Sequence, residues 1–119
     1  MTPEKLISMA RSATFDTQPD KNTWEDKQYL LALNEARAYL YGKCPEVRVT
    51  AVVGLTAYAA VEEEDIAEEM AEDAVYLPFY VEYMAWKFFD SGTDSESNSR
   101  KAREHKAGMA QALMALAGR

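Results

Sequence analysis

Apolar residues recur every three or four positions along most of the chain, which is the spacing of amphipathic helices. A Thr-Pro-Glu opening, with a capping hydroxyl and then proline at the first helical position, predicts a helix near 3–13. A second helix is expected near 24–41, where Thr23 would cap its start, Gly42 would end it and Pro45 would prevent its resumption.

The pattern is weaker in the middle of the chain. Around 47–61, β-branched residues cluster and Gly54 supplies a turn, so this stretch predicts a short β-hairpin, although its alanines leave a helix open. Over 65–73, Ile66 and Met70 stand four positions apart among carboxylates. This spacing predicts a short amphipathic helix that repulsion between like charges weakens.

The most apolar stretch predicts a helix near 77–90 with apolar surface on two sides. Seven of the thirteen aromatic residues lie between Tyr76 and Phe89. A helix that is apolar on both sides must be covered on both. We expect a chain this small to need another copy or a partner to cover it, with a central core helix as the alternative. Tyr and Trp suit such contacts, since each combines a large apolar area with a polar group. The residues expected at the interface are Phe79, Tyr80, Tyr83, Trp86 and Phe89.

A last helix is expected near 95–117, after a short Asp-Ser-Gly turn that would place it antiparallel to the aromatic helix. The predicted fold class is therefore mainly α. It is a small bundle of four to five helices, with a short β-hairpin inserted between the second and third helices, in a single domain over 1–119.

The formal net charge of −7 comes from one segment. Residues 62–73 (EEEDIAEEMAED), called the acidic segment below, hold eight carboxylates and no basic side chain, whereas the rest of the chain is near neutral. A nucleic-acid-binding domain shows the opposite imbalance. We expect either a solvated face or a binding surface, carried by Glu62, Glu63, Glu64, Asp65, Glu68 and Glu69.

A basic cluster, formed by Arg100, Lys101, Arg103 and Lys106, occupies the first half of the last helix. Three arrangements are open: the two charged regions pair within one copy, they are solvated independently, or they join two copies. A negative patch that faces a neighbour's positive patch is a head-to-tail contact, and such contacts close into a ring where the rotation permits.

The sequence holds no motif for catalysis, and no cofactor or metal is expected. His105 has no Ser or Cys partner in a recognisable arrangement, so we expect it to pack at a helix edge. Cys44 is the only cysteine, which excludes a disulfide framework. The acidic segment lacks the spacing and the glycine of an EF-hand loop. A phosphate-binding loop and a nucleophile elbow are also absent, so the expected protein is not an enzyme.

The N-terminus is charged and has no long apolar run, so no secretory signal is expected. The longest apolar stretch is too short to cross a bilayer. We therefore expect a protein made in the cytoplasm without membrane contact.

The order of elements resembles that of the head-to-tail adaptor, or connector, proteins of tailed bacteriophages, over most of the chain. An N-terminal helix and a polar loop lead to TWEDKQYLLALNEARAYLYGKCPE and then to the β-like VRVTAVVGLTAY. The second half is the more suggestive: an aromatic helix, an acid-rich turn and an Ala- and basic-rich helix in YLPFYVEYMAWKFFDSGTDSESNSRKAREHKAGMAQAL. The long carboxylate run departs from the family's pattern, so the geometry of 62–73 stays open.

This resemblance implies a virion protein that forms a ring, usually of twelve copies, at the head–tail interface. Its partners would be further copies of itself, the portal protein, and tail or stopper proteins. DNA would pass through the ring without being read, and an acidic segment on the channel wall would repel its phosphates. The same analogy expects Leu113, Leu116 and Arg119 to reach toward the portal.

A second interpretation stays open. The chain would then be a small cytosolic helical interaction or regulatory module whose acidic segment binds a basic partner.

Overall fold

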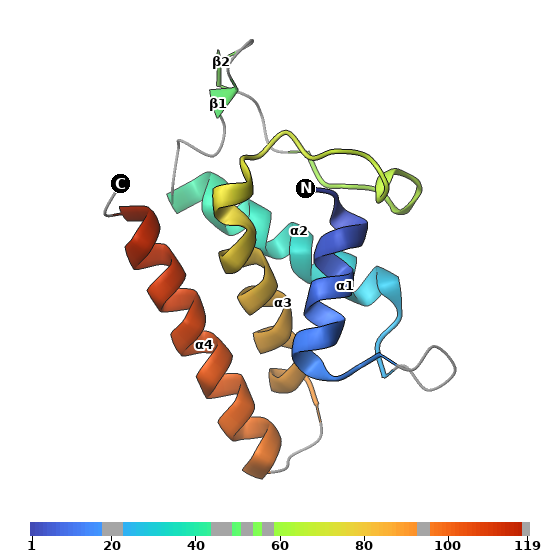
Figure 1. Ribbon diagram of the computed structural model, residues 1–119, viewed down its shortest axis with the longest axis vertical. Helices are drawn as coiled ribbons and strands as arrows, with labels where there is room; N and C mark the ends of the chain where they lie inside the picture. The colour runs from blue at the N-terminus through green and yellow to red at the C-terminus, as the bar shows by residue number, and fades with distance from the viewer. Residues whose placement is uncertain (18–22, 44–48, 51–53, 56–58, 93–95, 118–119) are drawn as a thin grey trace.

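The computed structural model describes residues 1–17, 23–43, 49–50, 54–55, 59–92 and 96–117 (Figure 1). In this part of the chain it is a compact, mainly α globule. Its α-helices are α1 (Pro3–Thr14), α2 (Asp26–Lys43), α3 (Leu77–Asp90) and α4 (Glu96–Ala117). Two 3-10 turns, η2 (Glu63–Asp65) and η3 (Ala74–Tyr76), precede α3.

The expected opening of α1 is confirmed. Oγ1 of Thr2 accepts a hydrogen bond from the backbone N–H of Lys5 at 3.2 Å, which satisfies one of the free donors of the first turn. At the other end Phe15 takes a left-handed conformation (φ 60°), and the N–H of Asp16 returns to the carbonyl of Arg11 at 2.9 Å. This is the bonding pattern that commonly ends a helix, although glycine is the usual residue at the left-handed position.

The start of α2 differs from the prediction, because Thr23 is not its cap. The helix begins at Asp26. The residue before it, Glu25, donates its N–H to Oε1 of Gln28 at 2.7 Å, which resembles half of a capping box. The N–H of Thr23 bonds instead to the carboxylate of Asp16 at 2.8 Å.

Between α2 and η2, β1 (Val49–Thr50) and β2 (Gly54–Leu55) form a two-residue antiparallel pairing in which Val49 lies opposite Leu55. Residues 47–48, 51–53 and 56–58 of the predicted hairpin at 47–61 lie outside the described part of the chain. The hairpin as a whole therefore stays a prediction.

The predicted helix over 65–73 is wrong, since this stretch contains no α-helix. Backbone groups that a helix would have paired bond to the start of the chain instead. The carbonyl of Ile66 accepts from the N–H of Glu4 at 2.9 Å, and the N–H of Met70 donates to the carbonyl of Met1 at 3.0 Å. Crowded carboxylates without basic partners disfavour a helix here, and the contacts with the start of the chain satisfy the backbone.

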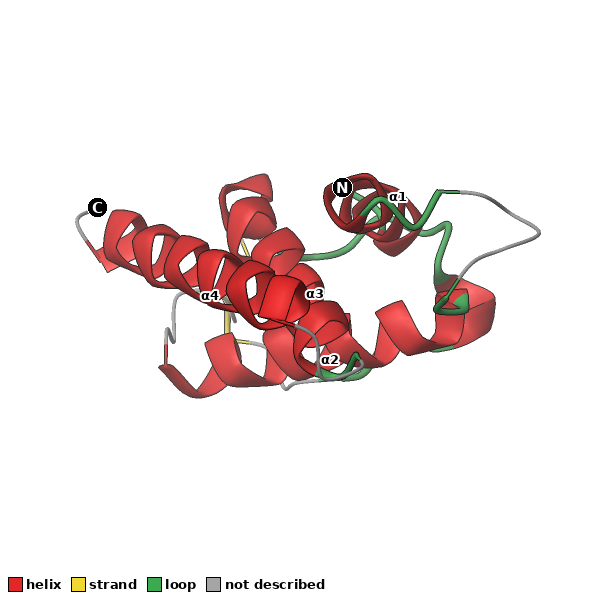
Figure 2. Ribbon diagram, turned by 90° about the horizontal axis from the view of Figure 1, so that it is seen from below, coloured by secondary structure: helices red, strands yellow, loops and turns green. Residues whose placement is uncertain are grey.

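Helix α3 lies in the middle of the molecule, with α1, α2 and α4 packed around it (Figures 1 and 2). Its residues Phe79, Tyr80, Met84 and Ala85 have no exposed surface. Helix α4 runs antiparallel to α3 and packs along it, as the short turn predicts. One copy of the chain therefore covers α3 in part. Five apolar residues of the helix stay half-buried, so the expectation that a partner covers the rest stays a prediction. These five are Leu77, Val81, Tyr83, Trp86 and Phe88.

Candidate functional site

The aromatic residues predicted at an interface fall into two groups. Phe79 and Tyr80 are 0% exposed, so they belong to the core and offer no surface to a partner in this conformation, while Phe89 is 6% exposed and offers little. Tyr83 and Trp86 are half-buried, and their rings meet edge to face with centroids 5.4 Å apart. These two residues, called the aromatic seam below, are what the structure leaves available of the predicted surface.

Basic side chains lie over the aromatic seam. The Nζ atoms of Lys87 and Lys106 lie 4.7 Å and 5.6 Å from the centre of the Trp86 ring, within the range of cation–π attraction. The hydroxyl of Tyr83 donates to Glu35 on α2 at 3.4 Å. Burial, and then the negative charge of Glu35, raise the pKa of Tyr83 to about 12. The seam thus offers an indole ring with two cations close to it.

One carboxylate of the acidic segment anchors that segment to the core. Glu72 is 5% exposed and accepts a hydrogen bond from Nε of Arg37, which is equally buried. Burial alone would lower the pKa of Arg37, but the hydrogen bond and the charge of Glu72 together raise it. Burial, followed by the charge of Glu72, also raises the pKa of Tyr80. Arg37 also donates to the carbonyl of Ala59 at 2.8 Å. Its side chain thus holds the chain just before the acidic segment, at Ala59, and near the end of the segment, at Glu72.

The other carboxylates of the acidic segment differ in their contacts. Asp73 accepts from the N–H of Val75 at 2.9 Å and caps η3, while Glu69 accepts from the amino group of Met1 at 2.7 Å. Four acids are exposed and a fifth is half-buried, and none of them forms an ion pair with another described residue. These five are Glu62, Glu63, Glu64, Asp65 and Glu68.

The basic cluster lies at the opposite end of the molecule from the acidic segment (Figure 1). Arg100, Arg103 and Lys106 are exposed. The Nζ atom of Lys101 lies 5.8 Å from the ring centre of Phe15 and 5.4 Å from that of Phe89. No ion pair joins the cluster to another described residue. Pairing of the two charged regions within one copy is therefore excluded in this conformation.

The residues expected to reach the portal are placed only in part. Leu113 and Leu116 are half-buried and pack against the core of their own chain. Arg119 lies outside the described residues. On the outer face of α4, Met114 is 73% exposed, so it offers more apolar surface than either leucine.

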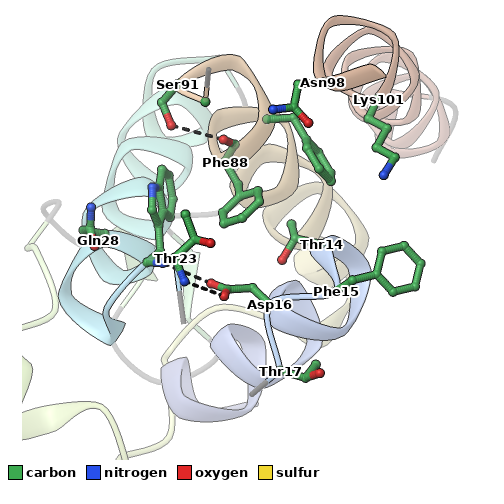
Figure 3. A pocket seen from close by; sticks show the side chains of 13 residues that line it. Thr14, Phe15, Asp16, Thr17, Thr23, Gln28, Phe88, Ser91, Asn98 and Lys101 are labelled. Carbon is green, nitrogen blue, oxygen red and sulfur yellow. Dashed lines mark hydrogen bonds between the residues drawn. The ribbon is translucent and has the colours of Figure 1, made fainter. Parts of the chain in front are cut away.

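A cavity of about 700 Å³ opens where the ends of α1 and α3 meet the starts of α2 and α4 (Figure 3). Its aromatic wall comes from Trp24 and Phe88, whose ring centres are 5.3 Å apart. Phe15 lies at the rim and is 79% exposed.

Asp16 beside this cavity is a structural residue that sequence reasoning missed. Its carboxylate accepts from Nη1 of Arg11 at 3.1 Å, from the N–H groups of Thr23 and Trp24 at 2.8 and 3.2 Å, and from the hydroxyl of Tyr29 at 3.0 Å. Burial, together with Asp16, raises the pKa of Tyr29. The carboxylate is saturated by its own chain and ties α1 to α2. An aspartate in a polar loop carries no signal of such a role.

The expectation that His105 packs at a helix edge is confirmed. Its ring stacks on that of Phe89, with centres 5.6 Å apart and planes 6° from parallel. Its Nδ1 lies 2.7 Å from Oε2 of Glu82, so the imidazole joins α4 to α3. Cys44 lies outside the described residues.

No three His, Cys, Asp or Glu side chains of the described residues come together as a metal ion would require. In the same part of the chain, no helix has the length and apolar character needed to cross a bilayer. The chain matches no protein-family model, no curated protein and no solved structure.

Proposed function

We propose that this chain is a structural, non-enzymatic subunit of a head-to-tail adaptor ring in a tailed bacteriophage. The observation that carries the proposal is the separation of the acidic segment and the basic cluster to opposite ends of one small subunit. Opposite charges at opposite ends favour association of identical copies in a head-to-tail arrangement, which is the arrangement from which closed rings are built.

Two further features support an assembly role. The fold is a mainly α globule, as the resemblance implies. Helix α4 packs along one side of α3 and leaves its outer face open, with Met114 as an exposed apolar residue. The proposed partners are further copies of the chain, the portal protein, and tail or stopper proteins, with DNA passing through the ring unread. No cofactor is proposed.

The test is to locate the chain in virions of the phage that encodes it. We expect mass spectrometry to detect it in purified particles, and electron microscopy to place it in a ring between portal and tail. A subunit of this kind can be monomeric until it docks. The test is therefore the protein composition of purified particles and not the size of the free protein in solution. Absence of the chain from purified virions, together with failure to bind the portal protein, would overturn the proposal.

The exposure of Glu62, Glu63, Glu64 and Glu68 favours a second candidate, a cytosolic interaction module that binds a basic protein. It predicts a stable complex with one basic partner that weakens when these four residues are changed to Gln. It also predicts that the chain is absent from virions, so the experiment on purified particles separates the two candidates.

A further inference from the structure

A second cavity, of about 500 Å³, lies between the end of α3 and the first half of α4. Trp86 and Phe89 line it from α3, while Ala102, Arg103 and Lys106 line it from α4. These five residues are called the basic pocket below. The pocket combines an apolar wall with two exposed cations at its edge.

The charges of the basic pocket are available to a partner. Arg103 and Lys106 are exposed, and neither forms an ion pair with a described residue. Lys87, also over the Trp86 ring, lies 3.7 Å from Glu35, so its charge is partly balanced. One carboxylate, Asp90, lines the pocket as well. The net charge around the pocket is positive, which suits an occupant that carries several carboxylates.

The chain itself presents such an occupant. Glu62, Glu63 and Glu64 are exposed at the η2 turn and form no ion pair with a described residue. The turn is held on both sides. The N–H of Val61 donates to Oδ1 of Asn34 at 2.9 Å before it, and the carbonyl of Ile66 is bonded to α1 after it. Because the turn is already ordered, docking it requires little loss of conformational entropy.

We propose that the basic pocket of one copy receives the carboxylates of Glu62, Glu63 and Glu64 from a second copy. Within one copy the η2 turn and the first half of α4, which carries the cations of the pocket, lie at opposite ends (Figure 1), so the contact must join two molecules. Each copy then donates one surface and accepts with the other, which makes the contact heterologous and lets it propagate around a ring. This inference rests on the proposed function in assigning self-assembly to the chain. It places these three acids at subunit contacts and not on a channel wall.

Charge reversal tests the contact. Glu63→Lys/Glu64→Lys reverses the charge of the turn, and Arg103→Glu/Lys106→Glu reverses the charge of the pocket. Each variant alone should lose self-association by at least about tenfold, measured by light scattering at low salt. An equal mixture of the two should recover it, since each mutant surface then meets its complement on the other variant. High salt should weaken the wild-type contact.

The matched controls are Glu25→Lys and Lys27→Glu, which reverse charges on an exposed pair away from both surfaces and should leave self-association unchanged. Circular dichroism of every variant confirms that it is folded. If both reversed variants assemble like the wild type, or if folded variants do not recover on mixing, the inference is overturned while an adaptor ring with other contacts still stands. A wild type that stays monomeric at the highest attainable concentration also overturns it.

Single-stranded DNA is the other occupant to examine, because aromatic rings with nearby cations also bind bases and phosphates. An oligonucleotide that binds the wild type, and loses affinity with Arg103→Glu/Lys106→Glu while self-association is unchanged, would assign the pocket to nucleic acid and overturn the inference. Absence of the chain from virions would instead count against the proposed function.

Discussion

Gly108 of α4 lies so close to Glu82 of α3 that a Cβ atom at position 108 would fall 2.7 Å from the Glu82 carboxylate. The same carboxylate is held by Nδ1 of His105, one helical turn earlier on α4. The absence of a side chain at position 108 therefore lets α4 approach α3 while a polar pair bridges the two helices.

We expect Gly108→Ala to stabilise the protein less than Gly42→Ala does. Alanine in a helix is favoured over glycine by up to about 1 kcal/mol. No atom of the described residues lies within 4 Å of a new Cβ at position 42, so the gain there should appear. At position 108 the new methyl group displaces Glu82 from His105 and offsets the gain. Urea unfolding of the two variants measures the difference, and equal stabilisation would contradict the close approach.

Loss of one partner of the Arg37–Glu72 ion pair should destabilise the protein more than replacement of both partners. Oε2 of Glu72 has no hydrogen-bond partner in the described part of the chain, so the carboxylate depends on Arg37. Arg37→Met leaves a buried charge uncompensated, and we expect a loss of about 3–5 kcal/mol in the free energy of unfolding. Arg37→Met/Glu72→Met should recover a large part of this loss, because neither charge is then buried alone. A double variant as unstable as the single one would contradict this account.

Phe79 and Trp86 should respond differently to truncation. Phe79 is 0% exposed, so Phe79→Ala should lower the unfolding free energy by about 3–5 kcal/mol. Trp86 is half-buried beside two lysines, so Trp86→Ala should lower it by clearly less. If the aromatic seam contacts another copy, the Trp86 variant should still lose self-association. Unfolding in urea and light scattering on the same samples separate these effects.

Stability should fall in alkali. The pKa values of Tyr29, Tyr80 and Tyr83 are raised by burial, that of Tyr83 to about 12. The folded state therefore holds these protons more tightly than the unfolded state, whose tyrosines ionise near pH 10. The resulting stability is fully present below about pH 10 and is lost as the pH rises toward the folded values, by up to about 1.4 kcal/mol per pH unit for each tyrosine.

Unfolding in urea between neutral pH and pH 11 checks this slope, and ultraviolet absorbance follows the ionisation. Tyr80→Phe is the matched variant, because it removes one titrating group and only a 3.4 Å hydrogen bond. Its slope should be shallower than that of the wild type. An identical slope would show that ionisation of Tyr80 does not contribute to the loss of stability in alkali.

Local sequence patterns were sufficient to predict a helix where the residues of the helix itself determine its start and its apolar face. The Thr-Pro-Glu opening predicts α1, and the apolar stretch at 77–90 predicts α3. The region 65–73 has helical spacing as well, but its carboxylates repel one another and its backbone bonds to the start of the chain. Those long-range bonds have no signature in the local pattern.

The order of the helices, the segregation of charge into two blocks and the apolar character of residues 77–90 are determined by the sequence itself, since they follow from which side chains stand where. Only the tertiary structure decided which residues of α3 its own chain buries, that Glu72 is the acid turned inward to Arg37, and that the two charged blocks lie at opposite ends. Each of these depends on distances between residues far apart in the chain. Periodicity fixes the faces of one helix and does not say what covers them.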